Sequence, residues 1–426
     1  MNSSHLETLA LHAGHQRSSE NPSAAIAINR TTAYNFQNTE HAANLFALKE
    51  LGYIYTRIMN PTQDVLEQRI AAMEGGAAAL ALASGTSAVF YSIINICTAG
   101  DEVVSSSHLY GGTFTMFNNI LPDYGITVRF VDPLDLNAIK AAINDKTRAV
   151  FLETIGNPAL SVPDLEAVAA VAHDHRLPLI VDATFTTPAL LKTIDYGADI
   201  VVNSLTKWIG GHGTGIGGVV IDAGRFDWSD PKFRTMNEPD SSYNGLRFAH
   251  DLGPLNPIGY ILRMRVIPLR NLGAAISPDN AWIFLQGMET LALRMERHSQ
   301  NALKVAEFLQ KHPKVEWVNY PGLAGHPTHA NARKYLQRGY GGMVVFGISG
   351  GRPAGEKFIN SLEMILHLAN VGDAKSLAIH PASTTHSQMS EEQQRAAGLP
   401  PEMVRLSIGI EHIDDIIAEL DRALNL

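Results

Sequence analysis

Cysteine is nearly absent from this 426-residue chain, which contains Cys97 and no other. A disulfide within the chain is therefore excluded, and catalysis or metal binding by several cysteines has no support. Cys97 follows the mainly apolar segment 93–96, so we expect it to be a core residue. The sequence also lacks the His-Glu-x-x-His motif of zinc proteases and a phosphate-binding loop ending in Gly-Lys-Ser/Thr, which argues against both classes.

Long apolar runs are absent as well, since none reaches the roughly 18 residues that a membrane-spanning helix needs. Residues 1–7 contain no basic segment followed by an apolar one, so we expect no secretory signal and take the cytoplasm as the compartment. The net charge is −9, with acidic and basic residues interspersed, which argues against nucleic-acid and membrane partners. A small-molecule substrate remains compatible with this charge. His380 and His386 are six residues apart, a spacing that does not make a convincing metal site.

The chain is long enough for more than one core, with 45% hydrophobic and 18% charged residues. We predict an N-terminal arm over 1–60, a large domain over 61–270 and a small domain over 271–426. Short apolar runs alternate with helical segments from about residue 75 to 222, which predicts a mainly parallel sheet covered by helices on both faces. The expected strands of this sheet are 79–83, 102–105, 127–131, 148–152, 178–182, 199–203 and 216–221.

Outside that sheet the signals are sparser. Asn60 and Pro61 are typical of a helix start, whereas the preceding residues have weak periodicity and read as extended. Residues 226–268 are irregular and aromatic, which indicates a long ordered excursion. We expect one helix over about 280–309, and then a smaller α+β unit with strands near 342–348 and 403–408 and a terminal helix.

The most informative residue is Lys207, which follows the apolar run 198–203 in Ser204-Leu205-Thr206-Lys207-Trp208-Ile209-Gly210-Gly211. A lysine at a strand end, between hydroxyls and a glycine-rich turn, can lose its proton and attack an aldehyde, which suggests covalent attachment of pyridoxal 5′-phosphate (PLP). An ordinary exposed lysine is the alternative. Asp182 ends the preceding expected strand, so the two side chains would meet at one crevice, where Asp182 could hold a proton on the pyridine nitrogen. A strand-end or capping carboxylate is the alternative for Asp182.

A phosphate group needs backbone donors and hydroxyls, and the segment Ala83-Ser84-Gly85-Thr86-Ser87 offers both at the start of an expected helix over 86–96. Ser204 and Thr206 could add hydroxyl donors, although an ordinary helix cap also explains Ser84 or Thr86. The glycines of 213–218 match the spacing of a dinucleotide-binding fingerprint. They lead into an apolar run that is typical of a strand, whereas that fingerprint opens a helix, so we reject a nicotinamide site there.

Arg405 lies in the expected strand Val404-Arg405-Leu406-Ser407-Ile408 of the smaller unit. Its planar guanidinium matches the α-carboxylate of an amino acid, and a structural salt bridge is the alternative.

These segments together resemble the cysteine/methionine-metabolism family of PLP-dependent enzymes, from about Leu9 to the C-terminus. The resemblance implies the aspartate-aminotransferase fold, an α/β fold of type I with a large mainly parallel-sheet domain and a smaller α+β C-terminal domain. The segments that carry it are Tyr55-Thr56-Arg57, Ser84-Gly85-Thr86, Tyr110-Gly111-Gly112, 153–158, Asp182-Ala183-Thr184, 204–213 and 404–411.

The resemblance also implies roles. Lys207 would carry the cofactor, Asp182 would contact its ring nitrogen, and the Tyr110 ring would stack on it. Tyr55 and Arg57 would reach the phosphate of a neighbouring subunit, so that active sites are shared in a homotetramer built as a dimer of dimers. Arg405 with Asn370 would bind the substrate carboxylate, and Tyr110 and Tyr55 could assist proton transfer. The remaining implied cofactor-binding residues are Gly85, Thr86, Asn157, Thr184, Ser204 and Thr206.

Within the family, the chain is most similar to O-acetylhomoserine sulfhydrylases, on segments 153–158, 277–278, 286–291, 369–373 and 380–386 and on the excursion 226–268. This likeness implies replacement of acetate by sulfide on O-acetylhomoserine to give homocysteine, a step of methionine biosynthesis. Cystathionine γ-synthase, O-succinylhomoserine sulfhydrylase and methionine γ-lyase activities are the alternatives on the same residues. Gly112 stands where the lyases carry cysteine, and Ala183 where the family often has asparagine. A silent binding or scaffolding relative is the alternative outside enzymes, against which Lys207 and Asp182 argue.

Overall fold

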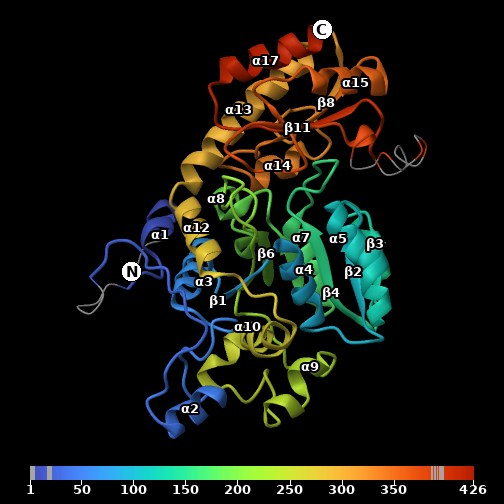
Figure 1. The fold of residues 1–426 in the computed structure, drawn as a ribbon. Coiled ribbons are helices and arrows are strands. Elements are labelled where there is room, and N and C mark those ends of the chain that lie inside the picture. The colour runs from blue at the N-terminus through green and yellow to red at the C-terminus, as the bar shows by residue number, and fades with distance from the viewer. Residues whose placement is uncertain (1–4, 17–21, 385–386, 388–389, 391, 393–397) are drawn as a thin grey trace.

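The computed structural model describes residues 5–16, 22–384, 387, 390, 392 and 398–426 (Figure 1). A large sheet lies in the middle of the molecule, with a smaller unit above it in this view and the excursion 226–268 below. Within the described part of the chain, none of the helices combines the length and the apolar character that crossing a bilayer would need.

The large sheet has seven strands in the order β1-β7-β6-β5-β4-β2-β3. β7 runs antiparallel to both of its neighbours, and all other pairs are parallel. The mainly parallel sheet expected from the sequence is therefore confirmed. Its strands are β1 Ala78–Leu82, β2 Glu102–Ser106, β3 Thr127–Val131, β4 Thr147–Glu153, β5 Leu179–Asp182, β6 Ile200–Ser204 and β7 Gly218–Asp222.

Helices cover both faces of this sheet because successive strand residues point to opposite sides. Leu152 of β4 packs in one core cluster with α1 Leu6–His12, α3 Pro61–Glu74, α7 Leu165–Asp174 and α12 Pro278–Glu289. Its neighbour Phe151 packs in a second cluster, with α4 Gly85–Ile94, α10 Gly259–Met264 and the aromatic excursion. The shorter elements around the large sheet are α5 Gly111–Thr115, η1 Met116–Ile120, η2 Leu121–Tyr124, α6 Leu136–Ala142, α8 Thr187–Leu190 and η3 Thr193–Tyr196.

The smaller unit is built on a five-stranded sheet in the order β10-β11-β12-β9-β8, which is antiparallel except for the β10–β11 pair. Its core joins α13 to the terminal helix, with Val305 and Leu309 in one cluster with Ile416 and Leu420. The elements are α13 Leu291–Lys311, β8 Val315–Asn319, α14 His329–Tyr335, β9 Met343–Ile348, α15 Gly351–Asn360, β10 Leu366–His367, β11 Leu377–Ile379, η7 Pro381–Ser383, β12 Met403–Ser407 and α17 Ile413–Asn425.

Two local expectations differ from the structure. The single helix expected over 280–309 is two helices, because Thr290 leaves the helical conformation between α12 and α13. Two short helices, α1 and α2 Thr39–Phe46, lie in the stretch expected to be extended; α2 begins where the Asn38 side chain accepts the His41 N–H. The helix start at Asn60 is confirmed, since its side chain accepts the Thr62 N–H at 2.9 Å. The proposed boundaries of arm and domains stay predictions.

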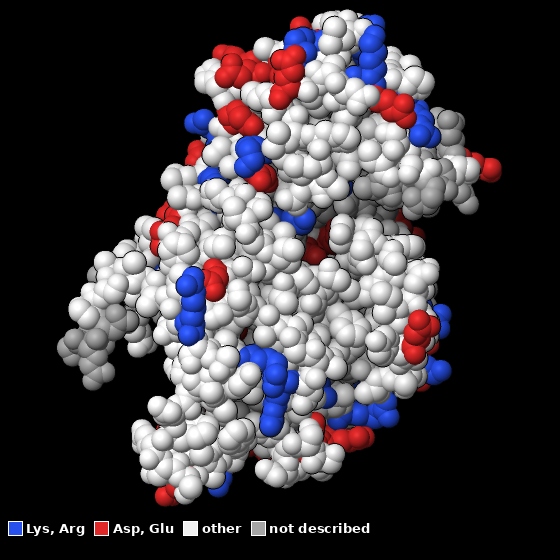
Figure 2. Space-filling model, viewed as in Figure 1, with Lys and Arg blue, Asp and Glu red and all other residues white. Residues whose placement is uncertain are grey.

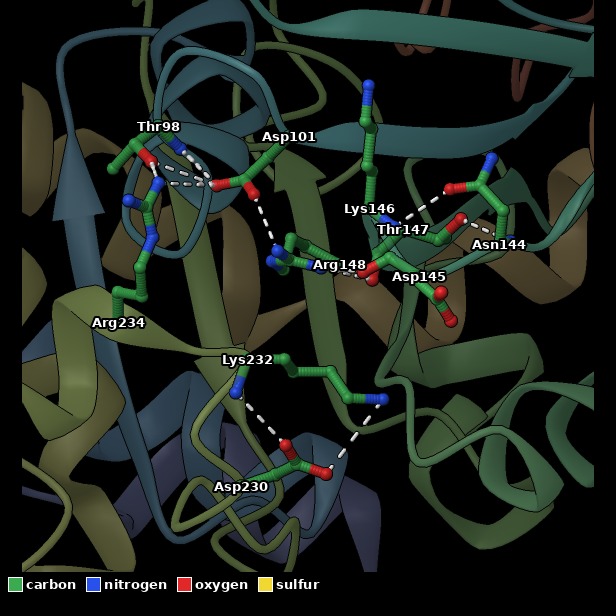
Figure 3. A network of polar contacts seen from close by, with 10 residues as sticks. All are labelled: Thr98, Asp101, Asn144, Asp145, Lys146, Thr147, Arg148, Asp230, Lys232 and Arg234. Carbon is green, nitrogen blue, oxygen red and sulfur yellow. Dashed lines mark hydrogen bonds and ion pairs between the residues drawn. The ribbon is translucent and has the colours of Figure 1, made fainter.

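The excursion is anchored beneath the amino-terminal ends of the strands by a polar network (Figure 3). Asp101, which precedes β2, contacts Arg148 of β4 at 2.8 Å and Arg234 of the excursion at 3.8 Å, and it accepts the Thr98 N–H. Arg234 opens a short helix that follows Phe233, a buried residue of the second core cluster. The irregular segment is thus held by both ion pairs and packing. Its elements are α9 Arg234–Asn237, η4 Ser241–Tyr243, η5 Gly253–Ile258, α10, η6 Arg265–Leu269 and α11 Arg270–Leu272.

Candidate active site

Lys207 lies in the turn that follows β6, at the carboxyl end of the parallel strands. Its side chain is half-buried, and its Nζ donates to Asn370 Oδ1 at 2.5 Å. Burial lowers the pKa of the Lys207 amine, and the positive charge of Arg405 lowers it further. The shift increases the fraction of neutral, nucleophilic amine at a given pH, which is the property that carbonyl chemistry requires.

The lysine turn is held by the smaller unit and by α13. Arg294 of α13 is buried and donates to the carbonyl oxygens of Trp208 at 2.7 Å and Ile209 at 3.1 Å. Gly372 packs so closely that a Cβ there would lie 2.6 Å from the Trp208 nitrogen. Its own N–H donates to Ser407 Oγ of β12 at 2.9 Å. The position of Lys207 therefore depends on residues far away in the sequence.

Two carboxyl groups stand next to each other at the same end of the sheet. Asp182 ends β5 and pairs in register with Glu153, which ends β4. Asp182 Oδ1 accepts the Thr184 N–H at 2.9 Å, and Glu153 accepts the Tyr110 N–H at 2.6 Å. Burial raises the pKa of both carboxyl groups, and the charge of Asp182 adds to the shift of Glu153. Among the described residues, neither has a cationic partner within 4 Å.

A small anion would find donors where α4 begins. The Ser84 side chain caps α4 by accepting the Ser87 N–H at 3.0 Å. A Cβ on Gly85 would lie 2.6 Å from the Ser204 Cβ, so only glycine lets this helix start approach the end of β6. Thr184 Oγ1 accepts the Ser204 N–H, which ties β5 to the same place. Free N–H groups of a helix's first turn bind anions such as phosphate.

Arg405 approaches the same crevice from β12 of the smaller unit. The side chain is half-buried, and burial lowers the pKa of its guanidinium, while Tyr110 acts in the opposite direction. No carboxylate lies within ion-pair distance of Arg405 in the described part of the chain. Figure 2 shows that the surface is hollowed between the two units, with acidic and basic atoms inside the hollow. An arginine that lacks an internal anion is suited to bind a carboxylate from outside.

Three more residues that were expected in the site make fewer contacts with the crevice residues described above. Thr206 Oγ1 lies beside the Gly217 backbone, in the lysine turn, and Thr86 is exposed in the first turn of α4. Asn157 is buried after β4, 9% exposed.

Tyr55 and Arg57 lie apart from this group. They line a different surface cavity, in which the Arg57 guanidinium stands 5.1 Å from the centre of the Tyr55 ring. In the segment 380–386, positions 385 and 386, and so His386, lie outside the described residues.

The described residues contain no group of three or more His, Cys, Asp or Glu side chains that could hold a metal ion. The glycines of 213–218 lead into β7, a strand that pairs with β1 and β6, and so they do not open a helix. This context removes the support for a nicotinamide site at that segment.

Known proteins match this arrangement over its full length. Residues 7–425 match the family described as Cys/Met metabolism PLP-dependent enzyme. The chain belongs to this family. It is 55% identical over 424 residues to O-acetyl-L-homoserine sulfhydrylase of Leptospira meyeri, covering 98% of this chain and 96% of the relative. It is 50% identical to homocysteine synthase of Schizosaccharomyces pombe, covering 100% and 99%.

A solved structure extends the likeness to the fold of the Cys/Met metabolism enzymes. A Campylobacter jejuni protein, named as a candidate O-acetylhomoserine (thiol)-lyase, superposes with a TM-score of 0.94 at 42% identity, covering 99% of this chain and all of its own. Its crystals contain a lysine linked to pyridoxyl 5′-monophosphate. The expected fold type is thereby confirmed.

The residues of the crevice fit the cofactor of the family. Lys207 offers an amine of lowered pKa, and Asp182 a half-buried carboxylate that lacks a cation among the described residues. Gly85 lets the start of α4 pack directly against Ser204, which brings the first-turn amides of α4 next to the end of β6. A pyridinium nitrogen and a phosphate would supply the missing partners of Asp182 and of the α4 amides.

Sequence reasoning gave no role to two residues of the site. Arg294 is one of two arginines in α13, and nothing local distinguishes it from Arg297. Glu153 stands at a strand end, as Asp182 does. That position could have indicated that Glu153 belongs to the same site. Its contact with Tyr110 joins residues 43 apart in sequence and was not foreseeable from spacing.

Proposed function

We propose that this protein catalyses the replacement of acetate by sulfide on O-acetylhomoserine, which yields homocysteine and acetate for methionine biosynthesis. The observation that carries the proposal is that Lys207 lies near Arg405, which has no carboxylate partner among the described residues, in a chain half identical to enzymes named for this reaction. The reaction of an amino-acid substrate requires an amine that transfers protons, here Lys207, and a guanidinium that binds the α-carboxylate, here Arg405.

Lys207 would hold PLP and then act as the base and acid of the reaction. Its lowered pKa lets Nζ take a proton from the substrate's α-carbon and return it later. PLP supplies an electron-accepting ring that stabilises negative charge at that carbon. The Asn370 side chain, 2.5 Å from Nζ, would orient the amine between these transfers.

The remaining residues would bind and orient. Asp182 would keep a proton on the ring nitrogen, since a buried carboxylate gains most from a cation at that place. Tyr110 would cover the ring and, with Tyr55, assist proton transfer. Arg405 with Asn370 would bind the α-carboxylate. The residues proposed to surround the cofactor are Gly85, Thr86, Asn157, Thr184, Ser204 and Thr206.

We further propose a homotetramer with active sites shared between subunits, in the cytoplasm. The support is that the stacked pair Tyr55 and Arg57 is exposed and lines a cavity apart from the chain's own crevice. In a partner's site this pair would supply a cation for phosphate and a phenol for proton transfer.

The test is product identification. Purified protein with PLP is incubated with O-acetylhomoserine, with and without sulfide, and in parallel with O-succinylhomoserine and with cysteine as the thiol. We expect homocysteine and acetate only when sulfide and the acetyl substrate are both present. Cystathionine from cysteine, or 2-oxobutyrate and ammonia without sulfide, as the main product would assign a different reaction of the family and contradict the proposal.

A further inference from the structure

Glu153 is a buried acidic residue with no counterion in the described part of the chain and no role in the chemistry above. Its side chain is 8% exposed, and its one hydrogen bond in the described part of the chain is the 2.6 Å bond from the Tyr110 N–H. The carboxyl group of Asp182 stands on the adjacent strand in the same register. Burying an acid beside another acid is unfavourable, so the contact with Tyr110 needs a functional explanation.

Tyr110 is the residue that this hydrogen bond fixes. It precedes α5, a helix of five residues, and no side chain caps that helix start. Its ring is 54% exposed and folds over Gly112, where a Cβ would lie 2.5 Å from the ring's Cε1 and 3.0 Å from its Cζ. Burial lowers the pKa of the Arg405 guanidinium, and Tyr110 offsets part of that shift, which places the two side chains near each other. The ring thus stands at the mouth of the crevice with little packing around it.

We propose that Glu153 is a positioning residue, whose buried carboxyl group holds the backbone of Tyr110 and so fixes the ring over the cofactor site. The ring is then located from two sides: Glu153 holds its backbone, and the missing side chain of Gly112 leaves the space into which it leans. This rests on the proposed function only in taking Tyr110 as the residue that covers the cofactor.

Glu153 performs this role as a neutral group. Burial and the charge of Asp182 both raise its pKa well above the usual range of a glutamate. A protonated carboxyl group still accepts the Tyr110 N–H through its carbonyl oxygen, and it leaves Asp182 as the single negative charge available to a ring nitrogen. Glutamine has the same shape and also offers a neutral carbonyl oxygen.

The test compares four variants of the PLP-loaded protein. Glu153→Ala removes the acceptor, whereas Glu153→Gln keeps it. Gly112→Ala pushes the ring away from the other side. Gly111→Ala is the matched control, since a Cβ at Gly111 would meet no atom within 4 Å in the same helix. The readouts are the circular dichroism of the bound cofactor, which reports the asymmetry of its stacking, and kcat/KM for the acetyl substrate.

We expect Glu153→Ala and Gly112→Ala to weaken the cofactor's dichroic band and to lower kcat/KM about tenfold, the size of one lost hydrogen bond. Glu153→Gln and Gly111→Ala should retain the wild-type dichroic band and the wild-type kcat/KM. A Glu153→Gln variant as impaired as Glu153→Ala would overturn the proposal, because it would show that the charge is what matters. An unchanged band in both Glu153→Ala and Gly112→Ala would overturn it as well.

Two features of the design keep the result interpretable. If Glu153→Ala does not fold, Gly112→Ala and Glu153→Gln still decide between the outcomes, because neither removes a buried group. The dichroic band needs no substrate. A wild-type protein that makes no homocysteine would therefore refute the proposed function, while the band in the four variants would still test the role of Glu153.

Discussion

At the amino-terminal edge of the large sheet, three buried acidic side chains have cationic partners. Asp101, 4% exposed, lies 2.8 Å from Arg148, and Asp199, 2% exposed, lies 2.7 Å from His173 (Figure 3 shows the first pair). Glu102 contacts Arg129 in the same region. Each of these three carboxylates is stabilised by a cation of the chain itself. Asp222, which ends β7 at the same edge, is the exception: it is fully buried without an ion partner among the described residues, and burial raises its pKa to about 7.

At the carboxyl edge of the same strands, Glu153 is buried and Asp182, Lys207 and Arg405 are half-buried, but they lack such partners among the described residues. Burial shifts the pKa of Asp182 and Glu153 upward and that of Lys207 and Arg405 downward, in every case toward the neutral form. The cost of these unpaired groups is tolerated where a ligand will complete them. We infer that the three paired carboxylates of the amino-terminal edge serve stability and that the carboxyl edge serves binding, and substitutions can separate the two.

The largest expected effect is on activity, at the carboxyl edge. Lys207→Ala removes the amine that we propose as the attachment point of PLP and as the proton-transferring group, so kcat should fall by about 10³-fold or more. The substitution should also change the visible absorption of the bound cofactor. It should not lower the thermal unfolding temperature of the cofactor-free chain. The exposed Lys140 gives the control, and Lys140→Ala should retain wild-type turnover. Substantial homocysteine formation by Lys207→Ala would refute its assigned role.

A matched pair of aspartates tests the comparison directly. Asp182→Asn should lower kcat about 10²-fold, because the ring nitrogen loses its anion, without lowering the unfolding free energy of the cofactor-free chain. Asp101→Asn should instead lower the unfolding free energy and leave turnover nearly unchanged. It leaves Arg148 buried without its carboxylate, and so it should cost about 3 kcal/mol of unfolding free energy while kcat/KM changes little.

Urea unfolding and steady-state kinetics of the Asp182→Asn and Asp101→Asn variants test whether the two edges have different roles. If Asp101→Asn impaired turnover as much as Asp182→Asn, the two edges would not be functionally distinct.

The carboxyl edge also contains the residues that were easiest to predict. Lys207 and Asp182 follow apolar runs that match β6 and β5, and the glycine at 85 stands at a helix start. These signals are local, since a strand end, a turn and a cap are each determined by a few neighbouring residues. Parallel topology then brings the strand ends to one edge, which is why the crevice could be placed before any coordinates were known.

What could not be predicted depends on contacts between distant segments. Arg294 reaches the Trp208 carbonyl across 86 positions, and its value lies in carbonyl acceptors that no motif encodes. The two-residue strand β10 and the three-residue strand β11 are too short to show a period. The break at Thr290 is also unmarked by glycine or proline, and it occurs where α12 packs against the lysine turn, with Gly287 in contact with the Ile209 and Gly210 carbonyls.

A smaller effect is expected at Arg405, which has no anion to lose within the described chain. Arg405→Lys keeps a positive charge but loses the planar pair of donors, so KM for O-acetylhomoserine should rise about tenfold, with a smaller change in kcat. The unfolding free energy should stay the same, because no internal ion pair is broken. Arg247→Lys, at an exposed pair with Asp251, controls for the substitution itself. An unchanged KM would mean that the substrate carboxylate is bound elsewhere.

The smallest effect is expected at the amino-terminal edge, and it depends on pH. The hydrogen bond to Asp199 raises the pKa of His173 above its ordinary value of 6.5. A raised pKa in the folded state means that the charged pair stabilises the protein fully below 6.5, and that this contribution is lost as the pH rises through the folded-state value. His173→Gln replaces the imidazole by a neutral donor. Wild type should therefore be the more stable protein at about pH 5.5, and the difference should close at about pH 9.

The His173 side chain is 41% exposed, so solvent screening limits the difference at low pH to less than about 1 kcal/mol. Urea unfolding of wild type, His173→Gln, Asp199→Asn and the double variant at both pH values isolates the pair from other effects of the substitutions. A coupling free energy that stayed constant between the two pH values would show that the imidazole is not titrating against Asp199. In that case the paired state of this edge would rest on the contacts of Asp101 with Arg148 and of Glu102 with Arg129.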